Sequence, residues 1–396
     1  MLVAAFFLAS APPAAFTDSP LEPCKGQFID GDLANAPAIS ESDDAFGDTT
    51  LLCYRVNDAS FFALEYWREQ LTPRWVAYEL TPINYGTDGC STYTRGTGNC
   101  YVQEDTWSQF QACEDGSDPF HSDHMLSEPK LSADPFSNTG HDRGHLAPRQ
   151  AFSWHVCGTY KTFSLANMSP QSAYLNQNTW QALEQQELTW AFDSGPMYIV
   201  SGTIFTEFPH THFAVYEEDN VLDDDQIYAS NNKMKQVVKK LHDNFLAHPS
   251  DHILHPKRDG KPNNIRAEAK ELRLPTGYFK VIYRPAIDGE PAHAIGFLLP
   301  HSLENLDKLV EGYHGMPVKH AFWAFASKIS LIESESGVSF PGIPDDLKEV
   351  WRDDWFFSRK TSRNIRKSSC GVGNPQGVLV NSALEERLQA CTDQLQ

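Results

Sequence analysis

Short hydrophobic runs along the chain predict a series of β-strands. Trp75–Thr81 alternates large apolar residues with polar ones, which is the pattern of a half-buried strand. Pro196–Phe205 is instead almost continuously apolar, as a buried strand would be. The five predicted strands are Leu51–Val56, Trp75–Thr81, Pro196–Phe205, Gly277–Tyr283 and Ala294–Leu299.

Three segments carry the spacing of helices. Phe61–Glu69 is a candidate short helix, and Lys233–Leu246 is amphipathic with several lysines. Those lysines suit a solvated face or, alternatively, the flank of a substrate groove. A third helix follows Gln171, and Ser172 is a suitable cap for it. Its regular positions are Leu175, Thr179, Leu183 and Gln186. Strands and helices together indicate a mixed α and β fold.

Composition divides the chain into four parts. Residues 1–16 form an apolar, small-residue run that is too short to span a bilayer, so we expect a secretory signal peptide. No lysine or arginine precedes this run, and a frayed N-terminus is the alternative. Residues 17–60 are rich in Pro, Asp, Ser and Ala and predict a loop-rich extension. We expect the folded domain at 61–345 and a disulfide-tethered C-terminal extension at 346–396.

The charge balance restricts the classes of function. The chain has 396 residues, of which 41% are hydrophobic, so it can form a large core. It carries 52 acidic against 32 basic residues, with a net charge of −20. A protein that coats nucleic acid through charge alone would be basic. An enzyme with a local positive groove remains possible.

Eight cysteines are present, and none forms a CxxC pair. Together with an export signal, an even number predicts disulfides. Short loops favour Cys90–Cys100 and Cys370–Cys391, followed by Cys24–Cys53. Buried thiols in a cytosolic protein are the alternative.

The densest polar segment is His141–Pro148, which reads HDRGHLAP. It gathers two imidazoles, a carboxylate and a guanidinium around Gly144, and Pro148 prevents a helix from running through it. We therefore expect a short strand or loop end that presents His145. His141 and His145 have the spacing of a helical zinc pair, but the glycine and proline disfavour that helix. A solvated loop is the other alternative.

Two further motifs follow at fixed spacing. Residues 167–171 read NMSPQ, and residues 176–184 read NQNTWQALE. DRGH followed by N-x-S-P-Q and N-x3-W-x2-L-E resembles the DNA/RNA non-specific endonuclease family, the ββα-metal nucleases that include mitochondrial endonuclease G. The close match covers Asp142–Glu184, and weaker similarity extends over Trp75–Phe340. The resemblance implies an α+β fold with a central antiparallel sheet, flanking helices and a ββα-metal finger over His141–Trp190.

The resemblance also implies hydrolysis of phosphodiester bonds with a bound divalent cation. His145 is the candidate general base, because an imidazole can accept a proton near neutral pH. Asn176 is the candidate metal ligand, since its carbonyl oxygen suits Mg²⁺, which keeps most of its waters. Mn²⁺ is the expected substitute. Glu184 is expected to hold waters of the cation through hydrogen bonds.

Two arginines are candidates for stabilising the charge of the phosphate. Arg143 lies in the DRGH motif, and Arg95 is the best-placed arginine of the loop-like stretch 82–138. An exposed arginine without a role is the alternative for Arg95. Some relatives carry a basic residue one turn after Glu184, where this chain has Leu188.

Other polar residues near the motif are expected to support it. Asn167 is expected to orient His145 or the loop beside it, and Asp142 to fix the motif through backbone hydrogen bonds. His121 and His124 resemble a metal pair, but no third ligand lies at a recognisable spacing, which favours a surface loop.

The expected substrates are DNA and RNA, cut with little sequence preference into 5′-phosphorylated oligonucleotides. No helix-turn-helix, zinc-finger or basic-zipper motif is found. The basic stretch Arg359–Lys367 is a candidate phosphate contact or a solvated tail. One alternative function is a catalytically inactive relative that only binds nucleic acid. Another is a zinc phosphatase or peptidase that uses His141 and His145. The expected location is secreted or periplasmic without a membrane anchor, and the oligomeric state is left open.

Overall fold

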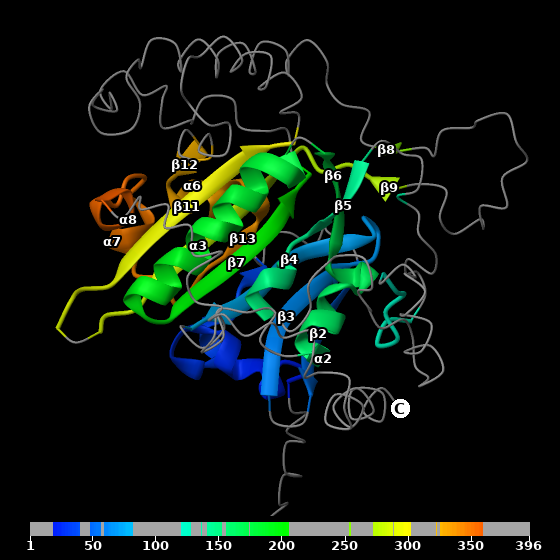
Figure 1. Cartoon of the computed structure of the whole chain (residues 1–396), viewed down its shortest axis with the longest axis horizontal. Helices are drawn as coiled ribbons and strands as arrows, with labels where there is room; N and C mark the ends of the chain where they lie inside the picture. Colours follow the sequence, from blue (N-terminus) through cyan, green and yellow to red (C-terminus); the bar gives the residue numbers. More distant parts are fainter. Residues whose placement is uncertain are drawn as a thin grey trace, which may run out of the picture.

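A seven-stranded antiparallel β-sheet forms the centre of the fold (Figure 1). Its strand order is β12-β11-β10-β7-β4-β3-β2. The computed structural model describes residues 19–39, 48–56, 59–81, 120–127, 136, 141–152, 156–173, 175–205, 253–254, 272–287, 289–301, 322 and 325–358.

The strands are β1 (Ala38–Ile39), β2 (Thr49–Val56), β3 (Ala59–Trp67), β4 (Thr72–Leu80), β5 (His141–His145), β6 (Met168–Ser172), β7 (Met197–Ile204), β8 (Ile253–Leu254), β9 (Leu272–Arg273), β10 (Gly277–Arg284), β11 (His293–Pro300), β12 (Ala326–Ser327) and β13 (Val338–Ser339). The α-helices are α2 (Val156–Thr162), α3 (Gln181–Ser194), α6 (Ile329–Ser336), α7 (Asp345–Lys348) and α8 (Asp354–Ser358). The 3₁₀ helices are η1 (Glu22–Gln27), η2 (Ile29–Gly31), η3 (Leu33–Asn35), η7 (Arg149–Phe152) and η8 (Leu165–Asn167), and η9 (Leu175–Trp180) is a π-helical segment.

The five strands predicted from hydrophobic runs are confirmed as β2, β4, β7, β10 and β11. The predicted α+β class with a central antiparallel sheet is confirmed as well. The helix predicted after Gln171 begins a few residues later, after β6 has ended at Ser172. Its four regular positions, Leu175, Thr179, Leu183 and Gln186, are all buried.

The helix predicted at Phe61–Glu69 is wrong, because this segment is β3 (Ala59–Trp67). Every residue from Phe61 to Trp67 is buried, so apolar side chains occupy both faces of the strand. A strand that is buried on both faces loses its alternating pattern and cannot be distinguished from a buried helix by periodicity.

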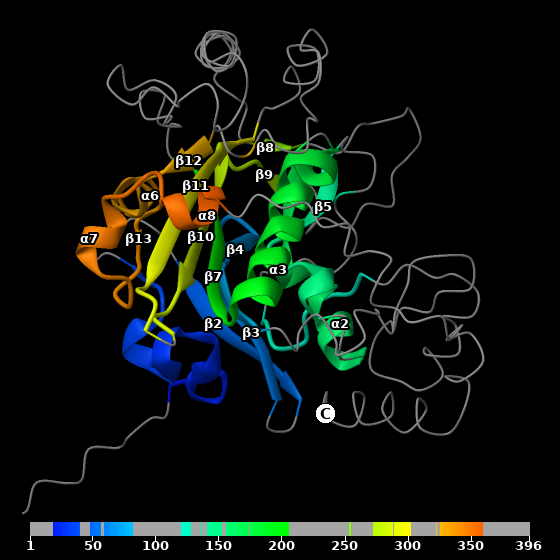
Figure 2. The same cartoon turned by 60° about the vertical axis from the view of Figure 1, so that its left-hand side comes forward.

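Helices and loops cover both faces of the central sheet (Figure 2). On one side lie α3, α2 and the strand pair β5–β6. On the other side lie α6, α7 and the N-terminal 3₁₀ helices. Side chains of the second layer pack edge-to-face on the sheet, with Phe28 against Trp75 at 6.5 Å and Phe340 against Phe279 at 5.9 Å between ring centroids. The sheet is therefore a central layer that positions α3 and the β5–β6 pair on one face.

A fully buried ion pair joins α3 to the middle of the sheet. Lys280 of β10 donates from Nζ to Oε2 of Glu187 at 2.8 Å, and both side chains have no exposed surface. The hydroxyl of Tyr78 donates to the other carboxylate oxygen at 2.7 Å. A buried charge without a partner is costly, so this pair strongly favours one docking position of α3.

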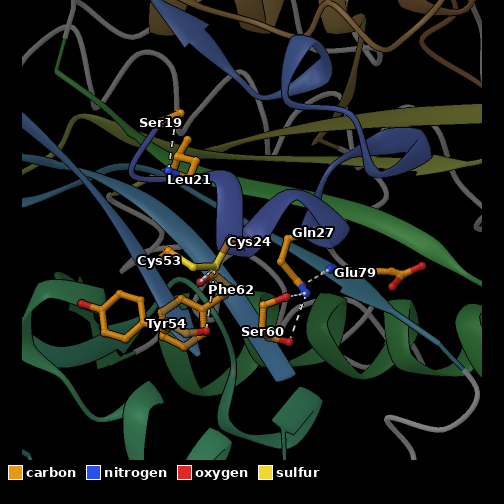
Figure 3. Close-up of a disulfide and its surroundings, with 9 residues drawn as sticks. All are labelled: Ser19, Leu21, Cys24, Gln27, Cys53, Tyr54, Ser60, Phe62 and Glu79. Carbon is orange, nitrogen blue, oxygen red and sulfur yellow. Dashed lines mark hydrogen bonds between the residues drawn. A yellow bond between two sulfur atoms is a disulfide. The ribbon is translucent and has the colours of Figure 1, made fainter. Parts of the chain in front are cut away.

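A disulfide between Cys24 and Cys53 fastens the N-terminal segment to the sheet (Figure 3). It joins η1 to β2, and its Cα atoms are 5.6 Å apart. Beside it, Gln27 donates to the carbonyl of Ser60 at 3.1 Å and accepts from the backbone N–H of Glu79 at 2.9 Å. One of the three predicted disulfides is thus confirmed, and the other two lie outside the described residues.

Several sequence predictions concern regions that the structure does not describe. These are the signal peptide at 1–16, the helix Lys233–Leu246, Arg95 and the basic stretch Arg359–Lys367. Within the predicted extension 17–60, β2 is a strand of the central sheet. Within 346–396, Phe356 of α8 packs against Trp190 at 4.9 Å. Among the described residues, no helix combines the length and the apolar character required to cross a membrane.

Replacing Lys280 should reveal how strongly the sheet depends on the buried ion pair. We expect Lys280→Met to lower the free energy of unfolding by about 3–5 kcal/mol, because it leaves the Glu187 carboxylate buried without its cation. The double variant Lys280→Met, Glu187→Leu should be more stable than the single variant. Urea denaturation followed by circular dichroism measures both. A loss below about 1 kcal/mol in the single variant would show that the pair does not fix α3.

Candidate active site

The candidate catalytic residues lie on a two-stranded ladder that is followed by a helix. Residues 141–145 of β5 pair antiparallel with residues 168–172 of β6. The hydroxyl of Ser172 then accepts a hydrogen bond from the backbone N–H of Leu175 at 3.2 Å, which caps the helix as predicted. This order of strand, strand and helix is the ββα finger predicted for His141–Trp190.

The strand conformation of β5 argues against a zinc pair of His141 and His145. Residues four apart on a strand are about 13 Å apart at roughly 3.3 Å per residue, too far to share one ion. The ring of His141 lies 5.3 Å from that of His301. His301 is already engaged, because Nδ1 bonds the carbonyl of Pro275 at 2.8 Å and Nε2 accepts the N–H of Ser172 at 3.1 Å. Within the described ranges no group of three His, Cys, Asp or Glu residues suited to a metal occurs.

Asp142 reaches across to the helix and orients the candidate metal ligand. Its Oδ2 accepts hydrogen bonds from the side-chain amides of Asn176 at 2.9 Å and Gln177 at 2.7 Å. Only the NH₂ group of an amide can donate, so the carbonyl oxygen of Asn176 is the atom left to accept or to bind a cation. The expectation that the Asp142 carboxylate bonds the backbone is wrong, because it accepts hydrogen bonds from side chains of the helix.

Gln171 is a buried residue of the finger that the sequence reasoning did not single out. It lies opposite Asp142 in the ladder and has no exposed surface. Among the described residues, neither its Oε1 nor its Nε2 has a hydrogen-bond partner. Its side chain fills the space where a Cβ on Gly144 would be, with Oε1 only 2.2 Å from that position. Gly144 is therefore required by packing against Gln171, and the NMSPQ motif was the sequence feature that named this residue.

The helix also holds the end of β5 that carries His145. The indole Nε1 of the buried Trp180 donates to the backbone carbonyl of His145 at 3.1 Å. The imidazole lies between two aromatic rings, 5.6 Å from Phe120 and 5.3 Å from Phe163 between centroids. The residue is partly exposed, while its Nε2 atom is buried. The two helix contacts, at Asp142 and at His145, fasten both ends of β5.

Asn167 supports the loop that follows His145. Its Nδ2 donates to the carbonyls of Ala147 at 3.0 Å and Thr162 at 2.9 Å, and its Oδ1 accepts from the N–H of Ala147 at 2.9 Å. The side chain is fully buried. Both amide hydrogens are used, so Asn167 acts through the backbone beside His145, which is one of the two roles expected for it.

The π-helical segment η9 changes the relation between Asn176 and Glu184. In a regular α-helix, eight residues would leave these side chains about 80° apart around the axis. A π-helical turn is wider and rotates less per residue, which reduces this offset. Such segments often occur at functional sites. Here the segment brings the two side chains closer to a common face of the helix.

The carboxyl of Glu184 lies in an environment that disfavours its charge. Burial raises the pKa of Glu184 to about 8, the ammonium of Lys280 opposes this, and the carboxyl of Glu187 adds to it. A bound divalent cation would instead favour the ionised form. We therefore expect the carboxyl of Glu184 to lose its proton when a divalent cation binds beside it.

Arg143 and Leu188 occupy two positions at which a positive charge could face the phosphate in this family. The guanidinium carbon of Arg143 lies 3.7 Å from the ring centroid of Phe120. Leu188, at the position where some relatives carry a basic residue, is 5% exposed and belongs to the core. Arg143 is thus the arginine of the DRGH motif that the structure describes, and Arg95 lies outside the described residues.

The segment around His121 is not the surface loop that was expected. His121 is buried and stacks on Tyr160 at 4.2 Å between ring centroids. Asp123 is buried as well and accepts a hydrogen bond from the hydroxyl of Tyr54 at 2.5 Å. Only His124 of the supposed metal pair is exposed. The segment is a packed support for the finger, because its buried polar groups find partners that lie far away in the sequence.

A hydrated divalent cation fits these residues. The carbonyl oxygen of Asn176 is a hard ligand that the contact with Asp142 leaves available. The buried amide of Gln171 lies beside Asp142 with both polar atoms without a bond in the described structure, which suits contact with ordered water. Asn176 and Glu184 are the residues that would hold the cation and its waters.

Acid should weaken the fold through His301. Burial and the nearby charge of His141 lower the pKa of His301 to about 4, below its ordinary value of 6.5. A depressed pKa contributes stability above pH 6.5 that is lost as the pH falls through 4. We expect the free energy of unfolding to drop by about 3 kcal/mol over this window. His301→Gln should show a smaller drop, and His124→Gln, an exposed control, an unchanged one. Equal pH dependence in all three proteins would contradict this assignment.

Comparisons with known proteins identify the family of the chain. The model of the family described as DNA/RNA non-specific endonuclease matches residues 45–341. Mitochondrial endonuclease G of Bos taurus is 29% identical over 131 residues, which are 33% of this chain and 36% of that protein, and the Homo sapiens protein matches equally. A nuclease of Nostoc sp. is 30% identical over 131 residues, 31% of this chain and 47% of that protein. The alignments thus span less than half of these relatives.

A solved structure titled as the EndoG/EndoGI complex has a TM-score of 0.46 and 19% identity, and the match covers 74% of this chain and 87% of that one. The family match alone extends over well more than half of the 396 residues. The chain belongs to the DNA/RNA non-specific endonuclease family.

Proposed function

We propose that this protein is a Mg²⁺-dependent endonuclease that hydrolyses the phosphodiester bonds of DNA and RNA without sequence or sugar preference. Membership of the family supports the reaction class. The observation that carries the proposal is the bond from Asn176 to Asp142, which lies three residues before His145 on the same strand. One oriented amide oxygen is enough as a protein ligand for a cation that keeps most of its waters.

His145 is proposed to be the general base. Because Nε2 is buried, we assign proton acceptance to Nδ1. A water molecule placed beside this nitrogen would give up a proton as its oxygen attacks the phosphorus. A base in hydrogen-bond reach typically contributes a factor of about 10²–10⁴. Trp180 and Asn167 contribute by holding the backbone carbonyl of His145 and the loop that follows it.

The remaining residues are proposed to stabilise the negative charge of the phosphate. When bound, Mg²⁺ would neutralise charge on the phosphate and ease the departure of the 3′ oxygen. Asn176 would ligate the cation directly, and Glu184 would hold its waters. The guanidinium of Arg143 would offset the extra charge of the transition state. The products would be 5′-phosphorylated oligonucleotides, and Mn²⁺ is the expected substitute.

We further propose that the protein is exported, to the periplasm or out of the cell. Two observations support export. The Cys24–Cys53 disulfide is of a kind that persists in oxidising compartments. Residues 2–16 have the apolar character of a signal peptide.

A nucleolysis assay with matched variants tests the proposed reaction. We expect the purified full chain to cut plasmid DNA and RNA with Mg²⁺, to stop with EDTA, and to recover with excess Mg²⁺ or Mn²⁺. His145→Ala should lower the rate by about 10²–10⁴. The exposed His124→Ala should not change it. Full activity of His145→Ala would rule out the mechanism, and a wild type that binds but never cuts would identify an inactive relative.

The packing of Gly144 against Gln171 predicts a second loss of activity. Gly144→Ala places a methyl group 2.2 Å from Oε1 of Gln171, so β5 or Gln171 must move. A displacement near 1 Å at a catalytic group can cost about 10²-fold in rate, and we expect a loss of that order. Gly26→Ala is the control, because nothing lies within 4 Å of its new Cβ. A wild-type rate for Gly144→Ala would show that the finger tolerates the methyl group.

A further inference from the structure

We infer that Phe120 is a positioning residue for the reaction and acts through Arg143. This inference rests on the proposed function, because it assigns Arg143 to the charge of the phosphate. Phe120 lies outside the three motifs of the finger, more than twenty residues before Arg143. Its ring nevertheless contacts the two candidate residues of β5 that matter for the chemistry.

The ring of Phe120 lies beneath the guanidinium of Arg143. The guanidinium carbon is 3.7 Å from the ring centroid, which is the stacking distance of a close cation–π contact. His145 is two residues further along β5 and therefore on the same face of the strand. Its imidazole is 5.6 Å from the Phe120 centroid at an interplanar angle of 54°. One aromatic ring thus sets the relative positions of the guanidinium and the imidazole.

Phe120 is itself held firmly by the chain around Phe163. The ring of Phe163 meets Phe120 edge-to-face at 5.1 Å, with an interplanar angle of 88°. The backbone N–H of His121 donates to the carbonyl of Phe163 at 3.3 Å, and the N–H of Leu165 donates to the carbonyl of His121 at 2.8 Å. These contacts fix the backbone directly after Phe120. The ring is therefore a fixed support on which the guanidinium of Arg143 rests.

The physical consequence is a lower cost of placing the guanidinium for catalysis. Arginine has many rotamers, and each one that must be excluded at the moment of reaction costs entropy. A planar guanidinium on an aromatic face directs its N–H groups outward in the plane of the group, the geometry in which it meets phosphate oxygens. Since these contacts matter most when phosphate charge grows, loss of the ring should act on kcat more than on KM.

Steady-state kinetics of Phe120 variants tests this role. We expect Phe120→Leu, which keeps apolar bulk without a ring, to lower kcat about tenfold with KM changed less than about threefold. Phe120→Tyr keeps the aromatic face and should stay within about twofold of the wild-type kcat. Phe340→Leu is the matched control, since it removes a buried ring that packs on the far face of the sheet, and its kcat should not change.

Coupling to Arg143 separates positioning from a merely structural effect. In an Arg143→Met background, measured by single turnover with excess enzyme, Phe120→Leu should cost less than about threefold further. An undiminished tenfold cost there would overturn the inference, and so would a wild-type kcat for Phe120→Leu while His145→Ala is inactive. A wild type that never cuts would overturn both the inference and the proposed function.

Discussion

The buried pair of Lys280 and Glu187 is the constraint on which the arrangement of the site depends. Neither side chain has exposed surface, so α3 cannot shift along the sheet without leaving a charge unpaired. The Lys280 ammonium also lies 4.7 Å from the ring centroid of Trp180. Trp180 in turn donates to the backbone of His145. A continuous set of contacts therefore runs from the middle of the sheet, through the helix, to the candidate base. The packing in the middle of the sheet therefore also determines where the backbone of His145 lies.

The finger itself needs few polar groups, because each of them is held by a neighbour that has no direct role in the chemistry. Asn176 is oriented by Asp142, and the loop after His145 is held by Asn167. The wider turn of η9 brings Asn176 and Glu184 closer to one face of the helix. A cation that keeps most of its waters requires only one protein ligand, so no cluster of carboxylates is necessary. A few polar residues are therefore enough for the candidate site, because neighbouring side chains hold them in place.

The sequence predicted the features that depend on local motifs. It did not predict contacts between residues that lie far apart in the chain. DRGH, NMSPQ and the helix after them were sufficient to predict the finger and the cap of its helix, and the roles of its residues stay predictions. The helix predicted at Phe61–Glu69 failed because a strand buried on both faces has no alternation. The partner of Asp142 lies 34 residues away, and that of Lys280 lies 93 residues away. No periodicity or spacing encodes such pairs, which is also why Phe120 was not singled out.

The acidic balance of the chain limits how a polynucleotide can be bound. Burial does not remove the imbalance, because the described core holds equal numbers of basic and acidic residues. The buried charged residues are Arg74, Lys161, Lys280 and Arg284 on one side and Glu65, Asp123, Glu187 and Asp353 on the other. The rest of the chain thus keeps the net charge of −20. Long-range attraction cannot gather a polyanion onto such a molecule, so affinity has to arise locally. In the described finger, Arg143 and Arg149 are arginines with partly exposed side chains. The proposed role of Arg143 therefore joins binding of the phosphate and stabilisation of its transition-state charge in one side chain.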